Sequence, residues 1–315
     1  MPFFCYTDYT MENIERYKHL NKYLKEKFGE RTLKICVDGN FSCPNRDGTC
    51  GTGGCIFCSE KGSGDHINST NSITLQVQNY FSSYKATRAN KFIIYFQNFT
   101  NTYDSLENLK QKYDSSLIDD RIVGIEFATR PDCITEEICK LLKSYSTKYY
   151  VCVELGLQTS NDNTAKIINR GYNSEIFTKA VNLLNKYNID IVTHIMVGLP
   201  NENFEDIKNT VSFINKHNIQ GIKIHSCYVV KNTKLAEMYF AGKYTPISFE
   251  EYMENLEYIL THISPNLIIH RISGDAPKDL LIAPDWNLHK KWVLNGIDKI
   301  LKEKDLWQGK YFNSN

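Results

Sequence analysis

Short apolar runs recur along the chain, and each has the length and composition of a buried β-strand. The first lies at residues 33–37, where apolar side chains alternate with others. The other runs are KFIIYFQ (91–97), RIVGIEFAT (121–129), YVCVELGLQ (150–158), IDIVTHIMVGLP (189–200) and GIKIHSCYVV (221–230). Strands that are apolar almost throughout, with long connections between them, indicate a parallel sheet covered on both faces.

Helical periodicity fills the intervals between these runs. It covers residues 11–29, 73–84, 104–115, 135–146, 174–187, 204–217, 248–262 and 288–304. Six strand–helix units predict an α/β fold, either a doubly wound sheet or an open (β/α)6 barrel, a partial version of the eight-unit TIM barrel. We favour the partial barrel. We expect an N-terminal helical segment (1–32), the barrel (33–244) and a C-terminal helical extension packed on it (245–315).

Composition narrows the class of protein. Of the 315 residues 42% are hydrophobic, enough for a sizeable core, and the net charge of +1 gives no overall electrostatic case for nucleic acid. No run approaches the roughly 20 apolar residues that cross a bilayer, so we expect no membrane partner. The first residues lack the basic start and long apolar core of a signal peptide, which predicts a cytoplasmic protein.

Cysteine usage separates two groups of thiols. The chain has ten cysteines, and in the cytoplasm they stay reduced. Core packing best explains the four that lie in apolar runs, namely Cys133, Cys139, Cys152 and Cys227. The cysteines between residues 36 and 58 differ, because they gather around a polar, glycine-rich loop where nothing requires a small hydrophobic side chain.

That loop, CPNRDGTCGTGGCIFC (43–58), directly follows the first strand. Cys43, Cys55 and Cys58 form the pattern C-x11-C-x2-C. Two thiolates three residues apart can face one metal centre, and the glycines let the backbone fold closely around an inorganic group. Three protein thiolates on a four-iron cluster would leave one iron open to another ligand. The loop lies at the C-terminal edge of the sheet, where the chemistry of barrels gathers.

Spacing alone leaves other uses of these cysteines open. A structural zinc site needs four ligands, and only Cys55 and Cys58 form the usual close pair. Cys36, Cys50 or His66 could complete a zinc site. A CxxC pair is also typical of thioredoxin-like redox proteins, although there it opens a helix in a smaller fold. Iron–sulfur, zinc and redox or structural use all stay open, with iron–sulfur favoured.

Several segments in order resemble one family. They are CPNRDGTCGTGGCIFCSEKGSGD, YFQNFTNTY, VELGLQTSN, INRGYN, THIMVGLP and HRISGDAPKDLLIAPDW. Together they resemble the YhcC/YtqA family of radical S-adenosylmethionine (SAM) proteins, which is similar to the radical SAM domain of the Elongator catalytic subunit. The likeness extends from about residue 14 to the WQGKYF segment near the end of the chain. It implies an open partial TIM barrel of the radical SAM type.

The resemblance implies two cofactors, a [4Fe–4S] cluster and SAM. Cys43, Cys55 and Cys58 would hold the cluster, and its fourth iron would take the amino and carboxylate groups of SAM. One electron from an external donor, of the flavodoxin or ferredoxin type, would split SAM into methionine and a 5′-deoxyadenosyl radical. That radical would remove hydrogen from a substrate, while the protein orients the cofactor and excludes water.

Polar residues near strand ends are the candidates for binding the methionine part of SAM. The resemblance places Gln97 and Thr100 near its amino group. Glu154, Gln158 and Arg170 form a second polar set, in which the Arg170 guanidinium suits a carboxylate. Each has a structural alternative, because Glu154 and Gln158 could cap a strand end and Arg170 could cap the preceding helix.

The adenine would need an apolar slot. Phe57, Met196 and the turn that begins at Gly198 are the candidates, although a methionine in a strand is more often a core residue.

A further polar set is free to face the substrate. Its members are Arg130, His194, His225, Tyr228, His270, Arg271 and Asp275. The arginines could bind phosphate or carboxylate. Singly, a histidine in a strand is more often a hydrogen-bonded core residue, and Asp275 could simply form a turn.

Substrate identity comes from the resemblance alone. It implies transfer RNA, with conversion of a carboxymethylaminomethyl group on C5 of the wobble uridine to an aminomethyl group. A radical enzyme acting on a small metabolite or peptide, and a non-catalytic zinc-stabilised binding module, stay open as alternatives.

Overall fold

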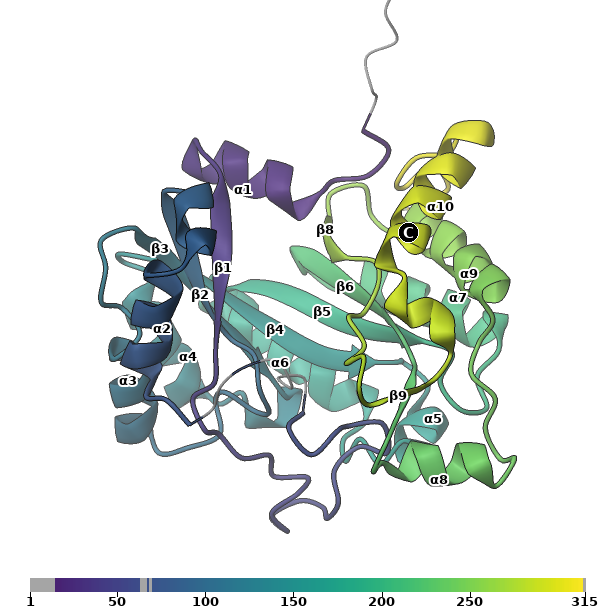
Figure 1. The fold of residues 1–315 in the computed structure, drawn as a ribbon, viewed down its shortest axis with the longest axis horizontal. Helices are drawn as coiled ribbons and strands as arrows, with labels where there is room; N and C mark the ends of the chain where they lie inside the picture. The colour runs from purple at the N-terminus through teal and green to yellow at the C-terminus, as the bar shows by residue number, and fades with distance from the viewer. Residues whose placement is uncertain (1–14, 63–66, 68–69, 314–315) are drawn as a thin grey trace, which may run out of the picture.

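The computed structural model describes residues 15–62, 67 and 70–313. Its main element is a seven-stranded sheet in the order β1-β2-β3-β4-β5-β6-β8, and every neighbouring pair is parallel (Figure 1). The strands are β1 (Thr32–Val37), β2 (Lys91–Phe96), β3 (Ile122–Thr129), β4 (Tyr150–Gln158), β5 (Asp190–Val197), β6 (Gly221–Ser226) and β8 (Ile268–Arg271). β1 and β8 form the edges of a curled half-barrel, which confirms the predicted open partial barrel.

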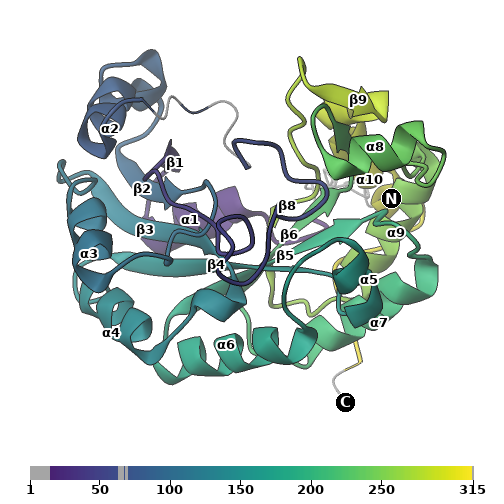
Figure 2. The same cartoon turned by 90° about the horizontal axis from the view of Figure 1, so that it is seen from below.

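Several helices cover the outer face of the sheet (Figure 2), and the described ranges contain ten helices. They are α1 (Leu20–Phe28), α2 (Ile73–Phe81), α3 (Leu106–Asp114), α4 (Glu136–Tyr145), α5 (Asp162–Ile167), α6 (Ser174–Lys186), α7 (Phe204–Asn215), α8 (Lys234–Phe240), α9 (Phe249–His262) and α10 (Lys290–Glu303). Single turns of 3-10 helix lie at η1 (Tyr84–Arg88), η2 (Pro131–Cys133) and η3 (Asp285–Leu288). β7 (Val229–Val230) and β9 (Leu281–Ala283) form an antiparallel ribbon. Figure 2 shows the helices in an arc around the curved sheet.

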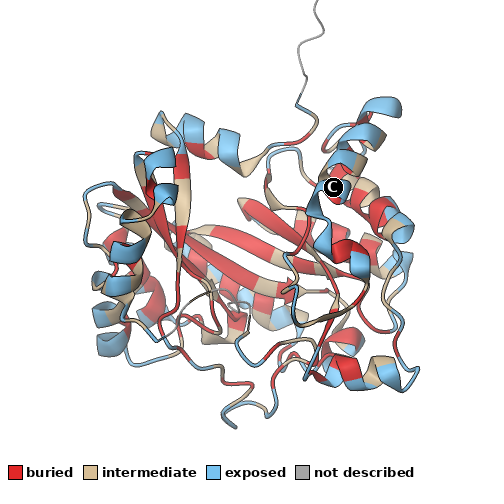
Figure 3. Cartoon of the chain, in the orientation of Figure 1, coloured by how far each residue is buried: buried red, intermediate tan, exposed pale blue. Residues whose placement is uncertain are grey.

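Side chains that alternate along each strand explain this arrangement. One set faces the helices and is apolar, as where Phe96 stacks on Phe127 and both contact Tyr113 of α3, at ring distances of 5.4 and 4.4 Å. Figure 3 shows the buried faces of the helices turned toward the sheet. The other set faces the inside of the half-barrel and contains charged residues.

Local sequence fixes where several helices begin. The side chains of Ser105, Thr135, Asn173 and Ser248 each accept a hydrogen bond from a backbone N–H in the first turn of α3, α4, α6 and α9. Such caps satisfy donors that a helix start leaves without partners. Among the helices of the described ranges, none has the length and apolar run needed to cross a bilayer.

Two expectations need correction. The helix predicted over 11–29 begins only at Leu20, since residues 15–19 are not helical and His19 instead bridges to Ile269; residues 11–14 lie outside the described ranges. The sheet also has a strand that the hydrophobic pattern did not predict, β8, which is short and ends in two polar residues. Because β8 lies beyond residue 244 and pairs with β6, the C-terminal segment contributes to the sheet itself. The division of the chain at 32 and 244 stays a prediction.

Candidate functional site

The cysteine loop crosses the C-terminal edge of the sheet. It lies between β1 and α2, and Figure 2 shows it in front of the strand ends. The loop folds on itself through backbone hydrogen bonds, from Arg46 N–H to the Cys43 carbonyl (2.8 Å) and from Gly54 N–H to the Asn45 carbonyl (2.8 Å). Gly54 has φ +75°, and a Cβ there would meet Arg46 at 2.8 Å, so glycine is required at this close approach.

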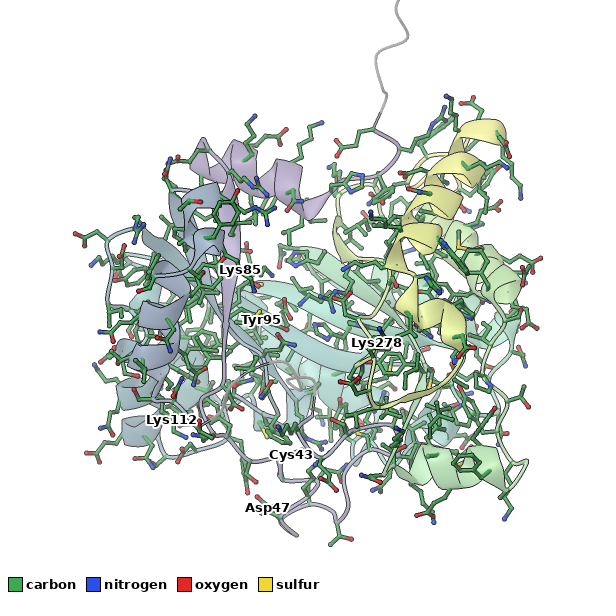
Figure 4. The ribbon with its side chains drawn as sticks, viewed as in Figure 1. Cys43, Asp47, Lys85, Tyr95, Lys112 and Lys278 are labelled. Carbon is green, nitrogen blue, oxygen red and sulfur yellow. The ribbon has the colours of Figure 1, made fainter. Side chains whose placement is uncertain are left out.

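Three cysteines of this loop are the expected metal ligands, and two of them, Cys55 and Cys58, are in contact. Cys58 N–H donates to the Cys55 carbonyl (3.0 Å), which turns the two side chains to the same side, and their sulfurs share a hydrogen bond. That bond outweighs burial and lowers the pKa of Cys58 to about 7. Cys43, labelled in Figure 4, lies close enough to act on the pKa of Cys55. A donor set of three thiols with one proton already labile fits a metal centre that binds thiolates.

A second loop holds the cysteine loop in place. Asn45 donates its side-chain amide to the Asn169 carbonyl (2.6 Å), and Asn169 donates back to the Gly54 carbonyl (2.8 Å). Ile56 N–H also donates to the Ile168 carbonyl (3.1 Å). This reciprocal contact, which we call the Asn45–Asn169 clasp, ties residues 45–56 to the end of α5.

Arg46 closes the other side of the loop. Its guanidinium donates to the carbonyls of Ser59 (2.5 Å) and Glu60 (3.1 Å). Sequence reasoning did not single out Arg46, Asn45 or Asn169, because their partners are mostly backbone carbonyls that a sequence does not display.

Beside the loop lies a cavity of about 850 Å³, a size typical of small-molecule sites. Residues 59–62 of the loop form one wall, and the ends of strands β1, β2, β6 and β8 with the segment 275–280 form the rest. Four of the seven expected substrate residues line it, namely His225, Tyr228, Arg271 and Asp275. Gln97 and Cys36 also line it. The structure therefore brings most of this set together next to the thiols.

The inside of the half-barrel carries a buried ionic network centred on Glu154. The Glu154 carboxylate accepts hydrogen bonds from Lys223 and Tyr95 (both 2.5 Å) and Lys34 (3.3 Å), and it contacts His194 Nε2 at 2.9 Å. Burial alone would raise the pKa of Glu154, but the two lysines outweigh it and hold the pKa well below its usual value. Figure 4 labels Tyr95 in this interior.

The network is close to neutral. Lys34 also pairs with Glu126, so two ammonium groups face two carboxylates. Burial lowers the pKa of His194, and lowers those of His225 and His270 well below the usual value, so these rings are uncharged at neutral pH. His270 was among the residues expected to face the substrate, whereas the four interior residues Lys34, Tyr95, Glu126 and Lys223 were absent from the expected site. Their signal in the sequence is a polar residue within an apolar strand.

Part of this network has the spacing of a metal site. Glu126, Glu154 and His270 offer ligand atoms within 4.8 Å of one another. The ammonium groups of Lys34 and Lys223 already neutralise both carboxylates, and a divalent ion would bring unbalanced charge into a buried space. We therefore assign the two carboxylates, Glu126 and Glu154, to ion pairing with these lysines.

The Arg170 side chain makes structural contacts, but they differ from the expected cap at the end of the preceding helix. It is fully buried and donates to the carbonyls of Tyr172 (3.0 Å), Thr159 (2.7 Å) and Leu157, and to Asp162 (3.4 Å). These contacts engage four of its five N–H groups. The guanidinium thus braces the segment that carries Asn169, and its expected contact with the methionine carboxylate stays a prediction.

Arg130 is likewise engaged away from the cavity. It forms a two-point pair with Asp132 (2.9 and 2.7 Å), donates to the Arg170 carbonyl (2.9 Å), and approaches Cys50 Sγ at 3.7 Å. The structure does not bring Arg130 to the other expected substrate residues. The structure instead places Arg130 beneath the cysteine loop. His194 lies between the ionic network and the cavity, because it is bonded to Glu154 and its ring is 5.4 Å from the ring of His225.

The remaining expected cofactor residues occupy separate positions. Thr100 is fully buried, and its hydroxyl has no hydrogen-bond partner within the described part of the chain. Gln158 ends β4 with a left-handed backbone (φ +59°) and accepts a hydrogen bond from the Tyr172 hydroxyl (3.3 Å). Phe57 and Met196 pack on one apolar cluster, as an adenine slot would require.

Gly198 lines a second cavity, of about 550 Å³, formed with residues 243–247. A Cβ at Gly198 would meet Ile247 at 2.8 Å, so this turn has a packing reason for glycine. Its expected contact with adenine stays a prediction, as do the cofactor roles of the residues above.

Known proteins resemble the chain in sequence and in fold. The family model described as "Radical SAM superfamily" matches residues 48–214, and the "Radical_SAM C-terminal domain" model matches residues 219–303. The uncharacterized protein YtqA of Bacillus subtilis is 40% identical over 300 residues, which cover 95% of this chain and 93% of that protein.

More distant relatives match in part. A tRNA uridine(34) acetyltransferase of Methanocaldococcus infernus is 31% identical over 166 residues, covering 51% of this chain and 30% of that enzyme. The structure of the archaeal Elp3 from the same organism, with its N-terminus deleted, superposes with a TM-score of 0.66 at 19% identity, covering 88% of this chain and 64% of that one.

Replacing Arg170 tests its role as a brace. Arg170→Ala leaves several buried carbonyls without donors, so we expect a loss of about 3 kcal/mol in the free energy of unfolding, measured by urea denaturation. Lys166→Ala, at an exposed position on the neighbouring helix α5, is the control and should change little. A loss below about 1 kcal/mol for Arg170→Ala would contradict the assignment.

The interior network makes a second prediction. Glu154→Gln leaves two buried lysines short of negative charge and should cost about 3–5 kcal/mol at neutral pH. Glu126→Gln should cost less, because burial outweighs Lys34 and raises the pKa of Glu126. Since the pKa of Glu154 is lowered in the folded state, its contribution is present at neutral pH and lost as the pH falls through that pKa. Equal losses for the two variants in urea denaturation would contradict this account.

Proposed function

The chain belongs to the radical SAM superfamily, and on that premise we propose that it is an enzyme that acts on the C5 side chain of the wobble uridine in tRNA, converting carboxymethylaminomethyl to aminomethyl. Members of this superfamily use a [4Fe–4S] cluster and SAM, and they need an external electron donor. When bound, the two cofactors supply one-electron cleavage of SAM and, through it, removal of a hydrogen atom from the substrate.

In this proposal Cys43, Cys55 and Cys58 hold the cluster. The observation that carries it is that the loop with these three cysteines crosses the C-terminal edge of the sheet beside the cavity, with Cys55 and Cys58 in contact. The chain's own residues then have three tasks. The Asn45–Asn169 clasp fixes the loop, the cavity residues hold the substrate near it, and the walls keep water away from the reacting atoms.

Within the cavity, the polar side chains differ in what they offer. Arg271 is paired with Asp275 (3.0 Å). Its guanidinium can therefore hold an anionic substrate group only if it binds that group together with Asp275, or releases Asp275 to bind it. His225 is uncharged and has an Nε2 atom without a hydrogen-bond partner in the described ranges, so it can accept or donate one bond to the substrate. We assign His225, Tyr228 and Arg271 to substrate binding.

Support for tRNA comes from a relative. The partial match to a tRNA uridine(34) acetyltransferase links the barrel segment to an enzyme whose name specifies the wobble position. The cavity volume of about 850 Å³ favours a second candidate, a radical enzyme acting on a small metabolite or peptide.

Cysteine replacement tests the ligand assignment. Cys55→Ala should abolish cluster assembly, measured as iron content after anaerobic reconstitution, because three thiolates are the minimum for holding the cluster in this proposal. Cys50→Ala is the matched control and should keep its iron, since the Cys50 sulfur faces Arg130 and Asp132. Loss of iron in the Cys50 variant alone would show that the ligand choice is wrong.

The reaction itself is tested in two steps. The reconstituted, reduced protein should release methionine and 5′-deoxyadenosine from SAM, and colourless protein that keeps one zinc would refute the enzyme. Nucleosides of tRNA from a deletion strain should then accumulate the carboxymethylaminomethyl form. An unchanged nucleoside profile beside active SAM cleavage would favour the small-substrate candidate.

A further inference from the structure

An exposed aromatic and basic segment lies at the start of α10. Residues 288–292, which read Leu-His-Lys-Lys-Trp, are all exposed, and we call them the stacking patch. The rings of His289 and Trp292 stack nearly parallel, with centroids 4.0 Å apart and planes 15° apart. Trp292 nevertheless keeps 55% of its surface exposed. One ring face is thus held in place while much of the indole meets solvent.

The patch adjoins the cavity that lies beside the cysteine loop. Lys290 donates to Asp275 at 3.0 Å, and Asp275 lines that cavity. Lys278 lines it too, and Figure 4 shows Lys278 beside the C-terminal segment that carries β9 and α10. The stacking patch is therefore joined to the cavity rim through the contact between Lys290 and Asp275.

Positive charge exceeds negative charge along this surface. The basic residues are Lys61, Lys231, Arg271, Lys278, Lys290 and Lys291. The acidic residues are Glu60, Asp275, Asp279 and Asp285. Asp275 is already shared between Arg271 and Lys290. Lys231 donates to a backbone carbonyl, that of Asp279 (2.9 Å), which leaves its charge unneutralised by that contact.

We propose that the stacking patch binds single-stranded RNA, with one base stacked on Trp292 and the adjoining lysines on its phosphates. The inference deepens the proposed function and rests on tRNA being the substrate. A nucleotide that enters a reactive cavity must leave the base stack, so its neighbours lose a stacking partner. An aromatic ring at the cavity rim replaces that partner, and a stacked base contributes on the order of 1–3 kcal/mol.

RNA fits this surface better than a protein partner does. A stable protein interface buries a large patch with an apolar centre depleted of charge. Here Leu288 and Trp292 are the exposed large apolar side chains within the patch, and two lysines separate them. The prior stacking of His289 on Trp292 also lowers the cost of ordering the indole when a base binds.

Fluorescence anisotropy with a labelled RNA hairpin, carrying an anticodon stem and loop, tests the inference on the reconstituted full chain. Trp292→Ala should weaken binding about tenfold, and Trp292→Phe should restore most of the loss, because phenylalanine keeps a stacking face. The matched control is Trp307→Ala. Trp307 is also exposed (46%) and has Lys310 over its ring at 4.5 Å, but it lies beyond the other end of α10.

Several results would overturn the inference. RNA affinity of Trp292→Ala equal to that of the unchanged protein would do so, as would an equal loss of affinity in Trp307→Ala. Binding of a blunt RNA duplex as tight as that of the hairpin would also overturn it. So would the formation, in RNA-free protein, of a dimer that depends on Trp292. SAM cleavage, measured in the same samples, should be unchanged in all variants. If the unchanged protein does not cleave SAM, that result counts against the proposed enzyme. If RNA affinity does not depend on Trp292, that result counts against the stacking patch alone.

Discussion

Thiols from two ends of a flexible, glycine-rich loop can meet only if the loop has one conformation, and the Asn45–Asn169 clasp supplies it. Two asparagine side chains exchange hydrogen bonds with backbone carbonyls across segments more than a hundred residues apart. The clasp works only because Arg170 braces the segment that carries Asn169. Ordering a loop costs conformational entropy, and these partly buried hydrogen bonds offset that cost before any metal binds.

The parallel sheet gives this loop its place. All strands point the same way, so the loop after β1 and the ends of β2, β6 and β8 meet at one edge and enclose the cavity. Curling the sheet creates an inner face that charged side chains line. The chain fills it with paired charges around Glu154, which makes the floor beneath the cavity polar but close to neutral. A neutral floor lets the rim, rather than the interior, set the preference for substrate charge.

Sequence reasoning reached the architecture because strand signals were strong. The predicted run at 150–158 coincides at both ends with strand β4 (Tyr150–Gln158). β8 escaped notice because it is four residues long and two of them are polar. Lys34 and Glu126 escaped because each looks, in one dimension, like a solvent-facing residue of a strand. Arg170 was recognised, but its carbonyl partners at Leu157 and Thr159 become visible only in three dimensions.

The ligands of the metal centre are the claim on which the account depends. Anomalous scattering at the iron edge, from crystals of anaerobically reconstituted protein, locates them directly. The account predicts a four-iron cluster bonded to the sulfurs of Cys43, Cys55 and Cys58, with its remaining iron turned toward the cavity that His225 and Arg271 line. A single metal held by four protein ligands, or a cluster bonded to Cys50 or Cys36 in place of one of the three, would contradict it.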